Sequence, residues 1–170
     1  MSNLTDNFRN AFRSYPTGVA IITARVDDRP IGMTVSSLAS LTLEPLALSF
    51  SVSNAAGSGG DFLRAPSFVF NLLAADQAAL AGIFANPAAM EQRFAADQGW
   101  DFLPTGEPYL PNAPWSLRAR PIGNLAVGSA RLIAAEVLNI LQGTAGAPLL
   151  YHDRTFLSVG DARQPVPAQD

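Results

Sequence analysis

The residues best suited to binding a ligand lie in one stretch, Ile31–Phe50, with the sequence IGMTVSSLASLTLEPLALSF. Two apolar segments in it flank a short link of small, hydroxyl-bearing residues that contains Thr34, Ser36, Ser37 and Ser40. Such a link presents hydroxyls and backbone N–H groups beside an apolar wall, which suits a flat ring system with a polar rim. The alternative is an ordinary connection between two strands, where serine is common.

A second stretch with binding chemistry is the glycine-rich segment Ser53–Gly60, SNAAGSGG. Glycines let successive backbone N–H groups converge on an anion, and Ser58 adds a hydroxyl beside them. A helical turn after the segment would point its N-terminus at the same place. The segment therefore predicts a phosphate cradle that needs no lysine, and a solvent-exposed turn is the alternative.

The residue types that are missing exclude several kinds of site. The chain has no cysteine, which excludes disulfides, thiolate metal sites and thiol nucleophiles. All 11 basic residues are arginine, so a P-loop lysine and a Schiff-base lysine are excluded as well. His152 is the single histidine, so no multi-histidine zinc or iron centre is possible and we expect no metal site.

Two further polar side chains each allow two interpretations. His152 stands between Tyr151 and Asp153 in a predicted hairpin, where it is either a general acid or base or a surface residue of the turn. No GxSxG sequence supports a serine hydrolase that would use it. Arg93 lies near the end of a predicted helix, where it either reaches a phosphate or is a solvated charge, and we expect the solvated charge.

Length and composition favour one globular domain over residues 1–170. Hydrophobic residues make up 48% and charged residues 15% of the chain, which excludes a disordered protein and indicates a partly apolar surface suited to self-association. The net charge of -3 gives no basic footprint for nucleic acid. The N-terminus lacks a signal-peptide pattern and no apolar run approaches a membrane span, so we expect a soluble, cytoplasmic protein without membrane contact.

Hydrophobic periodicity and turn residues predict the order of the elements. The N-terminal segment 1–15 is expected to be helical, and the tail 160–170 is expected to fray. Other helical segments are expected at 61–64, 76–85 and from Pro87 onward, with a long loop over 95–114. Strands are predicted over 18–25, 31–35, 46–52, 67–73, 115–120, 125–141, 149–151 and 155–159, with a turn at Pro121–Asn124.

This order indicates the fold class. Several strands follow one another in hairpin order, and the helices are inserted late. The pattern predicts a mainly β protein with inserted helices, built as an antiparallel barrel. No GxGxxG turn joins a strand to a helix, so a Rossmann fold has little support.

Three runs of sequence resemble the flavin reductase family, the small reductase components of two-component flavin-dependent monooxygenases. They are PTGVAIITA, RPIGMTVSSLASLTLEPLALSFSVSN and FVFNLLAADQ, and weaker matches include Trp115, AAEV at 134–137 and PLLYHDRTF near the end. The resemblance covers residues 8–158. It implies a split antiparallel β-barrel that binds FMN or FAD, forms a homodimer, takes NADH or NADPH as electron donor and supplies reduced flavin to a partner monooxygenase.

The resemblance also implies site residues. The hydroxyl-rich link would line the isoalloxazine ring and the ribityl chain of the flavin with Thr34, Val35, Ser36, Ser37 and Ser40. Asn54 and Ser58 would lie near the phosphate, and Thr17 is a further candidate. The nicotinamide would deliver a hydride to N5 of the flavin, so the flavin carries the chemistry and the protein positions it.

One motif of the family is altered in this sequence. Many members carry Gly-Asp-His at the start of the strand that ends in AAEV, and its histidine is associated with nicotinamide binding. Counting back from AAEV places Gly123, Asn124 and Leu125 there. Leucine neither donates a hydrogen bond nor titrates, so we expect the nicotinamide side of the site to be altered more than the flavin side.

These observations leave three functional hypotheses. The first is an NAD(P)H:flavin oxidoreductase, which predicts flavin-dependent oxidation of NAD(P)H. The second is a flavin-binding protein on the same scaffold without that activity, which predicts flavin binding alone. The third is a non-catalytic interaction module, which predicts no affinity for flavin.

Overall fold

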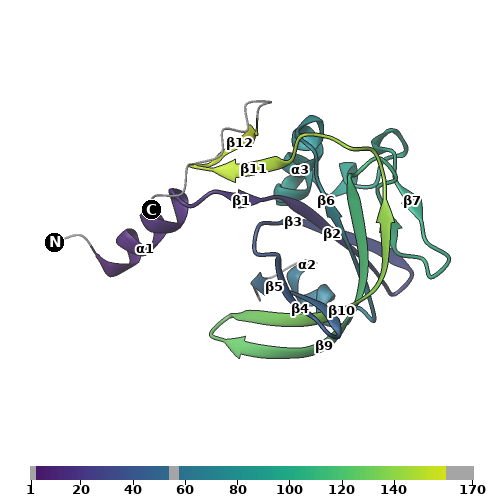
Figure 1. Ribbon diagram of the computed structural model, residues 1–170, viewed down its shortest axis with the longest axis horizontal. Coiled ribbons are helices and arrows are strands. Elements are labelled where there is room, and N and C mark those ends of the chain that lie inside the picture. The colour runs from purple at the N-terminus through teal and green to yellow at the C-terminus, as the bar shows by residue number, and fades with distance from the viewer. Residues whose placement is uncertain (1–2, 54–57, 160–170) are drawn as a thin grey trace, which may run out of the picture.

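The structure, a computed structural model, describes residues 3–53 and 58–159 (Figure 1). Its centre is a seven-stranded antiparallel sheet with the strand order β3-β2-β6-β9-β10-β5-β4. These strands span β2 Ala20–Val26, β3 Arg29–Val35, β4 Ala39–Leu43, β5 Leu46–Ser53, β6 Phe68–Leu72, β9 Trp115–Val127 and β10 Ala130–Gln142. A second sheet has the order β1-β11-β12, with β1 Thr17–Gly18, β11 Leu149–His152 and β12 Thr155–Ser158.

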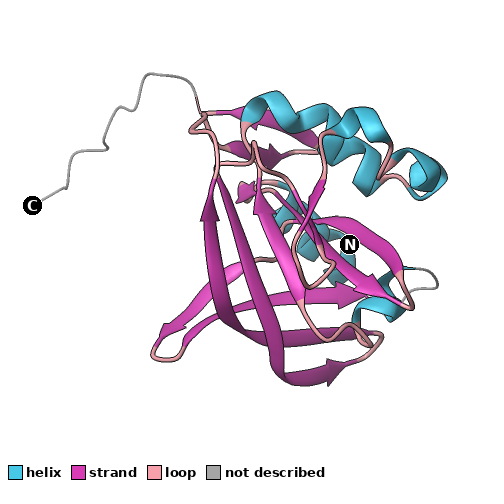
Figure 2. Cartoon of the chain, turned by 90° about the vertical axis from the view of Figure 1, so that its right-hand side faces the viewer, coloured by secondary structure: helices cyan, strands magenta, loops and turns pink. Residues whose placement is uncertain are grey.

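The large sheet has to curl because its two edge strands are joined by a short connection. β3 ends at Val35 and β4 begins at Ala39, so the linker Ser36–Leu38 spans the gap. Four peptide units reach at most about 14 Å. Seven flat strands would set these edges about 29 Å apart. The sheet is therefore rolled up (Figure 2), which agrees with the predicted split antiparallel barrel.

The inside of the rolled sheet is filled by aromatic side chains from strands that are not adjacent in it, since β9 and β10 separate β5 from β6. Phe50 on β5 packs against Phe68 and Phe70 on β6 with ring centroids 5.3 and 4.9 Å apart, in edge-to-face geometry. Ile22 on β2 is fully buried in the same cluster. Edge-to-face packing is a favourable arrangement of aromatic rings, so this cluster joins β5 and β6 across the inside of the rolled sheet.

Strand β2 is buried on both faces. Ile22 faces the inside of the barrel, whereas Ile21 faces a second apolar cluster that also contains Phe84 and Leu110. Helix α3, Ala78–Ala85, contributes this outer cover together with the 3-10 turns η1 Ala75–Gln77, η2 Pro87–Gln92 and η3 Ala96–Gln98 (Figure 2). Burial on both faces explains why this strand is almost continuously apolar in sequence.

Arg93 does not remain a solvated charge, so that prediction is wrong. Its side chain is 6% exposed, and its guanidinium donates to the backbone oxygens of Gly32 (2.8 Å) and Asn86 (3.2 Å). It also lies 5.7 Å from the centre of the Phe84 ring. Burial lowers the pKa of Arg93 below its ordinary value. The residue joins strand β3 to the helical cover.

The predicted turn at Pro121–Asn124 is also wrong. Strand β9 continues through these residues, and the chain turns at Gly128–Ser129 instead, with Gly128 in the left-handed region at φ 54°. Ala134 and Ala135 of β10 pair with Gly123 and Pro121, so Ile122 is an extra residue in a bulge. Bulges tolerate proline inside a strand, which is why the proline did not end this one.

Most other elements agree with their predicted positions. Helix α1, Leu4–Arg13, begins after the capping residue Asn3 and stands away from the sheet (Figure 1). The predicted helical turn near 61–64 is helix α2, Ser58–Phe62. The predicted long loop contains a small ribbon of β7 Asp101–Phe102 and β8 Pro108–Tyr109. The tail 160–170 lies outside the described residues, and no described helix is long and apolar enough to cross a membrane.

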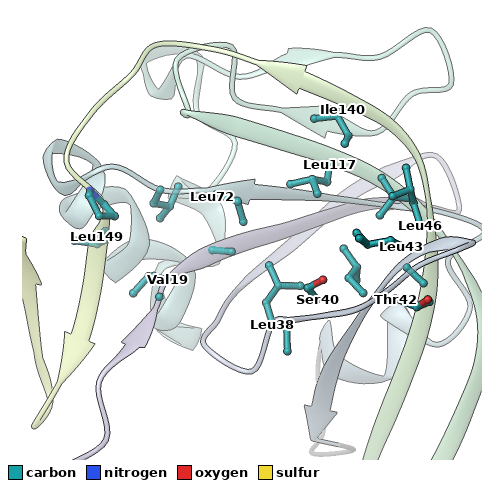
Figure 3. Close-up of a pocket in the computed structure, with 18 residues that line it drawn as sticks. Val19, Leu38, Ser40, Thr42, Leu43, Leu46, Leu72, Leu117, Ile140 and Leu149 are labelled. Atoms are coloured by element: carbon teal, nitrogen blue, oxygen red, sulfur yellow. The ribbon is translucent and has the colours of Figure 1, made fainter. Parts of the chain in front are cut away.

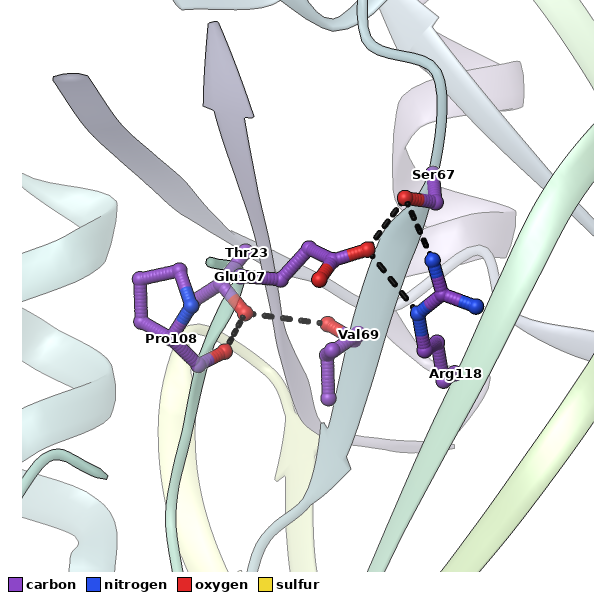
Figure 4. Close-up of polar contacts among 6 residues, drawn as sticks. All are labelled: Thr23, Ser67, Val69, Glu107, Pro108 and Arg118. Atoms are coloured by element: carbon purple, nitrogen blue, oxygen red, sulfur yellow. Dashed lines mark hydrogen bonds and ion pairs between the residues drawn. The ribbon is translucent and has the colours of Figure 1, made fainter. Parts of the chain in front are cut away.

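A buried polar cluster fastens the loop around Glu107 to the outside of the sheet (Figure 4). The Glu107 side chain is buried, and its carboxylate accepts hydrogen bonds from Ser67 and from Nε of Arg118 (2.9 Å). Thr23 donates to the carbonyl oxygen of the next residue, Pro108, at 2.5 Å. Burial by itself raises the pKa of Glu107, but these hydrogen bonds, others from Thr105 and the backbone, and the charge of Arg118 outweigh it and hold the pKa below its ordinary value.

This cluster makes stability depend on pH. Because the pKa of Glu107 is lower in the folded than in the unfolded chain, the ionised form stabilises the fold above the unfolded-state pKa, and this contribution disappears as the pH falls through the folded-state pKa. Glu107→Gln places an amide against Arg118, and we expect it to lower the free energy of unfolding at neutral pH by about 1–3 kcal/mol. Urea unfolding over a pH series measures this. The same acid sensitivity in variant and wild type would contradict the assignment.

Candidate functional site

Two adjoining polar clefts lie where the Ser36–Leu38 linker, strand β1 and the turn between β11 and β12 come together. The larger has a volume of about 810 Å³ and is lined by residues that include Arg13, Thr17, Ser36, Ser37, His152 and Arg154. The smaller, of about 390 Å³, is lined by residues that include Thr34, Ser36, Arg154 and Phe156. Because Ser36, Tyr151 and Arg154 line both, we treat the two as one site and call it the polar cleft.

Backbone pairing brings distant parts of the chain to this cleft. Thr17 on β1 pairs with Tyr151 on β11, so the predicted candidate Thr17 lies beside the C-terminal hairpin. The backbone N–H of Asp153 donates to the carbonyl oxygen of Arg13, 3.0 Å away, which ties the turn to the end of helix α1. The rings of Tyr151 and Phe156 pack 5.3 Å apart and add an aromatic surface.

Some hydroxyls of the predicted link are hydrogen-bonded within the fold, and one is free to bind a ligand. The Ser37 hydroxyl accepts from the backbone N–H of Ser51 (3.0 Å) and donates to the carbonyl oxygen of the same residue (3.3 Å). The Thr34 hydroxyl donates to the carbonyl oxygen of Ala81 in helix α3 (2.6 Å). Ser36 is exposed, and its hydroxyl has no hydrogen bond to any residue that the structure describes. Ser36 is thus the link hydroxyl that a ligand in the cleft can use.

The charges around the cleft are mainly positive. Arg9 pairs with Asp6 at 3.4 Å, and Arg13 lies 3.8 Å from Asp153. Arg154 makes neither an ion pair nor a hydrogen bond with the described residues. Hydroxyl donors and arginines together suit a ligand rich in acceptors or negative charge.

Two residues predicted with the link have other surroundings. Val35 is buried in the barrel core. Ser40 lines a separate cavity of about 460 Å³, which is otherwise walled mainly by aliphatic side chains such as Leu43, Leu46 and Ile140 (Figure 3). Leu38 lines both this apolar cavity and the polar cleft, so the linker forms their common wall.

The predicted phosphate cradle is only partly described. Asn54 lies outside the described residues, and so does the side chain of Ser58. The backbone of Ser58 begins helix α2, so a helical turn follows the glycine-rich segment as expected. The role of these residues toward a phosphate stays a prediction.

The nicotinamide-side candidates lie on a strand instead of a turn. Gly123, Asn124 and Leu125 belong to β9, and Leu125 pairs with Leu132 of β10. They line neither the polar cleft nor the apolar cavity. The strand that contains AAEV starts at Ala130, so Gly123, Asn124 and Leu125 lie on the preceding strand and not at its start. A contact of residues 123–125 with nicotinamide stays a prediction.

Sequence reasoning missed the arginines of the cleft. Arg13 and Arg154 are 141 positions apart by numbering, and only the pairing of β1 with β11 brings them together. A usable signal was the pair Asp153-Arg154 at the tip of a predicted hairpin, because both residues need positive φ there (44° and 63°) and arginine is an unusual residue for that conformation. The described residues contain no cluster of groups that could hold a metal ion.

Comparison with known proteins decides which family this architecture represents. The family model described as "Flavin reductase like domain" matches residues 12–160. The chain belongs to this flavin reductase family. The match confirms the resemblance that the runs around Pro16 and Ile31–Phe50 carry.

Individual members of the flavin reductase family are similar over most of their length. The chain is 35% identical to "NADH:FMN oxidoreductase" of Rhodococcus qingshengii, covering 88% of this chain and 79% of that protein. It is 30% identical to "FADH(2)-dependent resorcinol hydroxylase, reductase component" of Rhizobium sp. (strain MTP-10005), covering 92% and 88%. The structure of a flavin reductase domain protein from Arthrobacter sp. FB24 matches with a TM-score of 0.85 and 28% identity, covering 98% and 99%.

The different surroundings of Ser36 and Ser37 give a paired prediction. Ser37→Ala removes the group that satisfies the Ser51 backbone, so we expect the free energy of unfolding to fall by about 1–2 kcal/mol. Ser36→Ala loses no internal hydrogen bond and is expected to stay within about 0.5 kcal/mol of wild type. Urea unfolding of both variants measures the difference. Equal stability of the two would show that Ser37 does not fasten the linker.

Proposed function

We propose that this protein is an NAD(P)H-dependent flavin reductase that binds FMN or FAD in the polar cleft and supplies reduced flavin to a partner monooxygenase. The observation that carries the proposal is that Thr17, Ser36 and Ser37, assigned to flavin by the family resemblance, line one polar cleft. Relatives of the chain are named as NADH:FMN oxidoreductase and as the reductase component of a monooxygenase.

The residues of the cleft fit a flavin nucleotide. Ser36 offers a free hydroxyl for the polar rim of an isoalloxazine ring, and Tyr151 and Phe156 offer apolar contact for its face. Arg13 and Arg154 offer positive charge toward a phosphate. Bound flavin supplies the redox chemistry by accepting a hydride from reduced nicotinamide, and it requires neither a metal ion nor a thiol.

The chain's own residues would bind and orient the flavin and leave one side of it accessible. Ser37 and Thr34 use their hydroxyls to hold the linker, so the wall on which the ring would rest is fixed before the ligand arrives. Such preorganisation reduces the entropy lost on binding. Tyr151 and Arg154 on the opposite wall are exposed, which leaves one side open to a nicotinamide and to exchange of reduced flavin.

We extend the proposal to a homodimer that works in the cytoplasm, where NADH and NADPH are regenerated. Large apolar side chains are exposed on helix α1, where Phe8 and Phe12 are 64% and 61% exposed. Others are exposed on the β9–β10 hairpin, where Leu125 and Val127 are 60% and 61% exposed. Exposed apolar surface of this kind is typical of interfaces. Light scattering is expected to give twice the chain mass of 17.9 kDa, and a monomer would contradict the dimer.

A flavin-binding protein without nicotinamide turnover is the second candidate. It is favoured by the absence of a titratable side chain at the nicotinamide-side candidates Gly123, Asn124 and Leu125. The two candidates differ in one measurable property, which is oxidation of NADH or NADPH in the presence of flavin.

Steady-state oxidation of NADH and NADPH, with and without FMN or FAD, tests the proposal. We expect turnover that requires flavin. Ser36→Trp fills the cleft and is expected to raise the apparent KM for flavin at least about tenfold, the cost of losing a good contact. Thr144→Trp, on an exposed loop outside the polar cleft, is the matched control and is expected to behave as wild type. Flavin binding without turnover would favour the second candidate, and neither binding nor turnover would overturn both.

A further inference from the structure

Arg154 occupies a backbone conformation that disfavours it. The turn between β11 and β12 consists of Asp153 and Arg154, with φ 44° and 63°. A Cβ atom is crowded in this left-handed region, which glycine adopts freely and which aspartate tolerates through local hydrogen bonds. The turn between β2 and β3 has the same geometry, with φ 50° and 59°, and uses the better-suited pair Asp27 and Asp28.

The Arg154 side chain gains nothing inside the described fold that would offset this strain. No described residue forms an ion pair or hydrogen bond with it, whereas Arg9 and Arg13 each have a carboxylate partner. In the other turn, Asp28 accepts a hydrogen bond from Arg25 at 2.9 Å. Residues in disfavoured backbone conformations whose side chains make no stabilising contact in the fold are concentrated at binding sites.

The position of Arg154 indicates what it binds. It lines both parts of the polar cleft, together with Ser36 and Tyr151. A guanidinium is a rigid set of donors that matches a phosphate, and it binds phosphate better than it binds neutral acceptors. The only carboxylate that lines the cleft among the described residues, Asp153, already faces Arg13 at 3.8 Å.

We propose that Arg154 binds a phosphate group of the ligand in the polar cleft, either the phosphate of a flavin nucleotide or a phosphate of the nicotinamide dinucleotide. This inference rests on the proposed function, because that function brings such ligands to the cleft. It makes Arg154 a specificity-determining residue. Binding of the phosphate would offset the cost of the left-handed backbone conformation of Arg154.

Arg154→Gly tests this without harming the fold. Glycine relieves the left-handed strain, so the thermal midpoint is expected to be equal or higher. Asp28→Gly is the matched control, since it changes the corresponding position of the other turn, remote from the cleft. The dissociation constants of FMN, riboflavin and NADH are measured by fluorescence titration for wild type and both variants.

The two sources of phosphate give different results. If Arg154 binds the flavin phosphate, Arg154→Gly lowers the affinity for FMN at least about tenfold. The affinity for riboflavin, which lacks the phosphate, is then unchanged. If Arg154 binds the dinucleotide, the affinity for NADH falls by the same factor, and the affinities for FMN and riboflavin are unchanged. Unchanged affinity for all three ligands, or equal weakening of FMN and riboflavin, would overturn the inference. Wild-type protein that binds none of them would overturn the proposed function and the inference with it.

Discussion

Ser37 lies in the three-residue linker between the two edge strands, and its hydroxyl serves the backbone N–H and carbonyl of Ser51 where a neighbouring strand would otherwise pair. Because the Ser37 hydroxyl takes the place of a neighbouring strand there, the linker can leave the sheet while the Ser51 backbone groups of β5 stay hydrogen-bonded. The linker in turn keeps the two edges of the sheet near each other, so the sheet is curled around its apolar core. The same three residues form the wall of the polar cleft. The curl of the sheet and the wall of the polar cleft therefore depend on one short segment.

The other walls of the cleft are held from outside the barrel. Thr34 is fixed to helix α3 through the carbonyl oxygen of Ala81, and Arg93 fixes the same strand through Gly32. An added Cβ at Gly32 would collide with the Phe84 ring, so the helical cover approaches β3 as closely as the backbone allows. The strand that leads into the linker is thus rigid, whereas the β11–β12 turn opposite is exposed. A fixed wall facing an accessible one suits a site from which a product has to leave.

The sequence was sufficient to predict the fold because its signals were local. Apolar runs such as Leu46–Val52, and turn residues such as Asp27-Asp28, indicated antiparallel strands in hairpin order. The errors arose where tertiary contacts overrode local propensity. Pro121 suggested a turn, but the bulge at Ile122 accommodates it inside a strand. Arg93 suggested a solvated charge, but two backbone oxygens and an aromatic ring compensate its burial.

For the candidate site, the sequence indicated residue types but not how their side chains are used. Ser36, Ser37 and Thr17 do meet at one cleft, but no sequence pattern separates the structural hydroxyl of Ser37 from the free hydroxyl of Ser36. Arg154 was missed because its place opposite the linker depends on the pairing of β1 with β11, two segments at opposite ends of the chain. The Asp153-Arg154 pair marks the turn itself, but no local pattern shows which strand the hairpin pairs with.

We propose that the polar cleft holds a flavin that the nicotinamide can reach. Anaerobic mixing of the protein–FMN complex with one equivalent of NADH tests it most directly, with the visible absorption of the flavin as the signal. We expect the absorption to bleach in a single turnover and to return when oxygen is admitted. A complex that binds FMN but keeps its visible absorption in the presence of NADH, and also of NADPH, would contradict it.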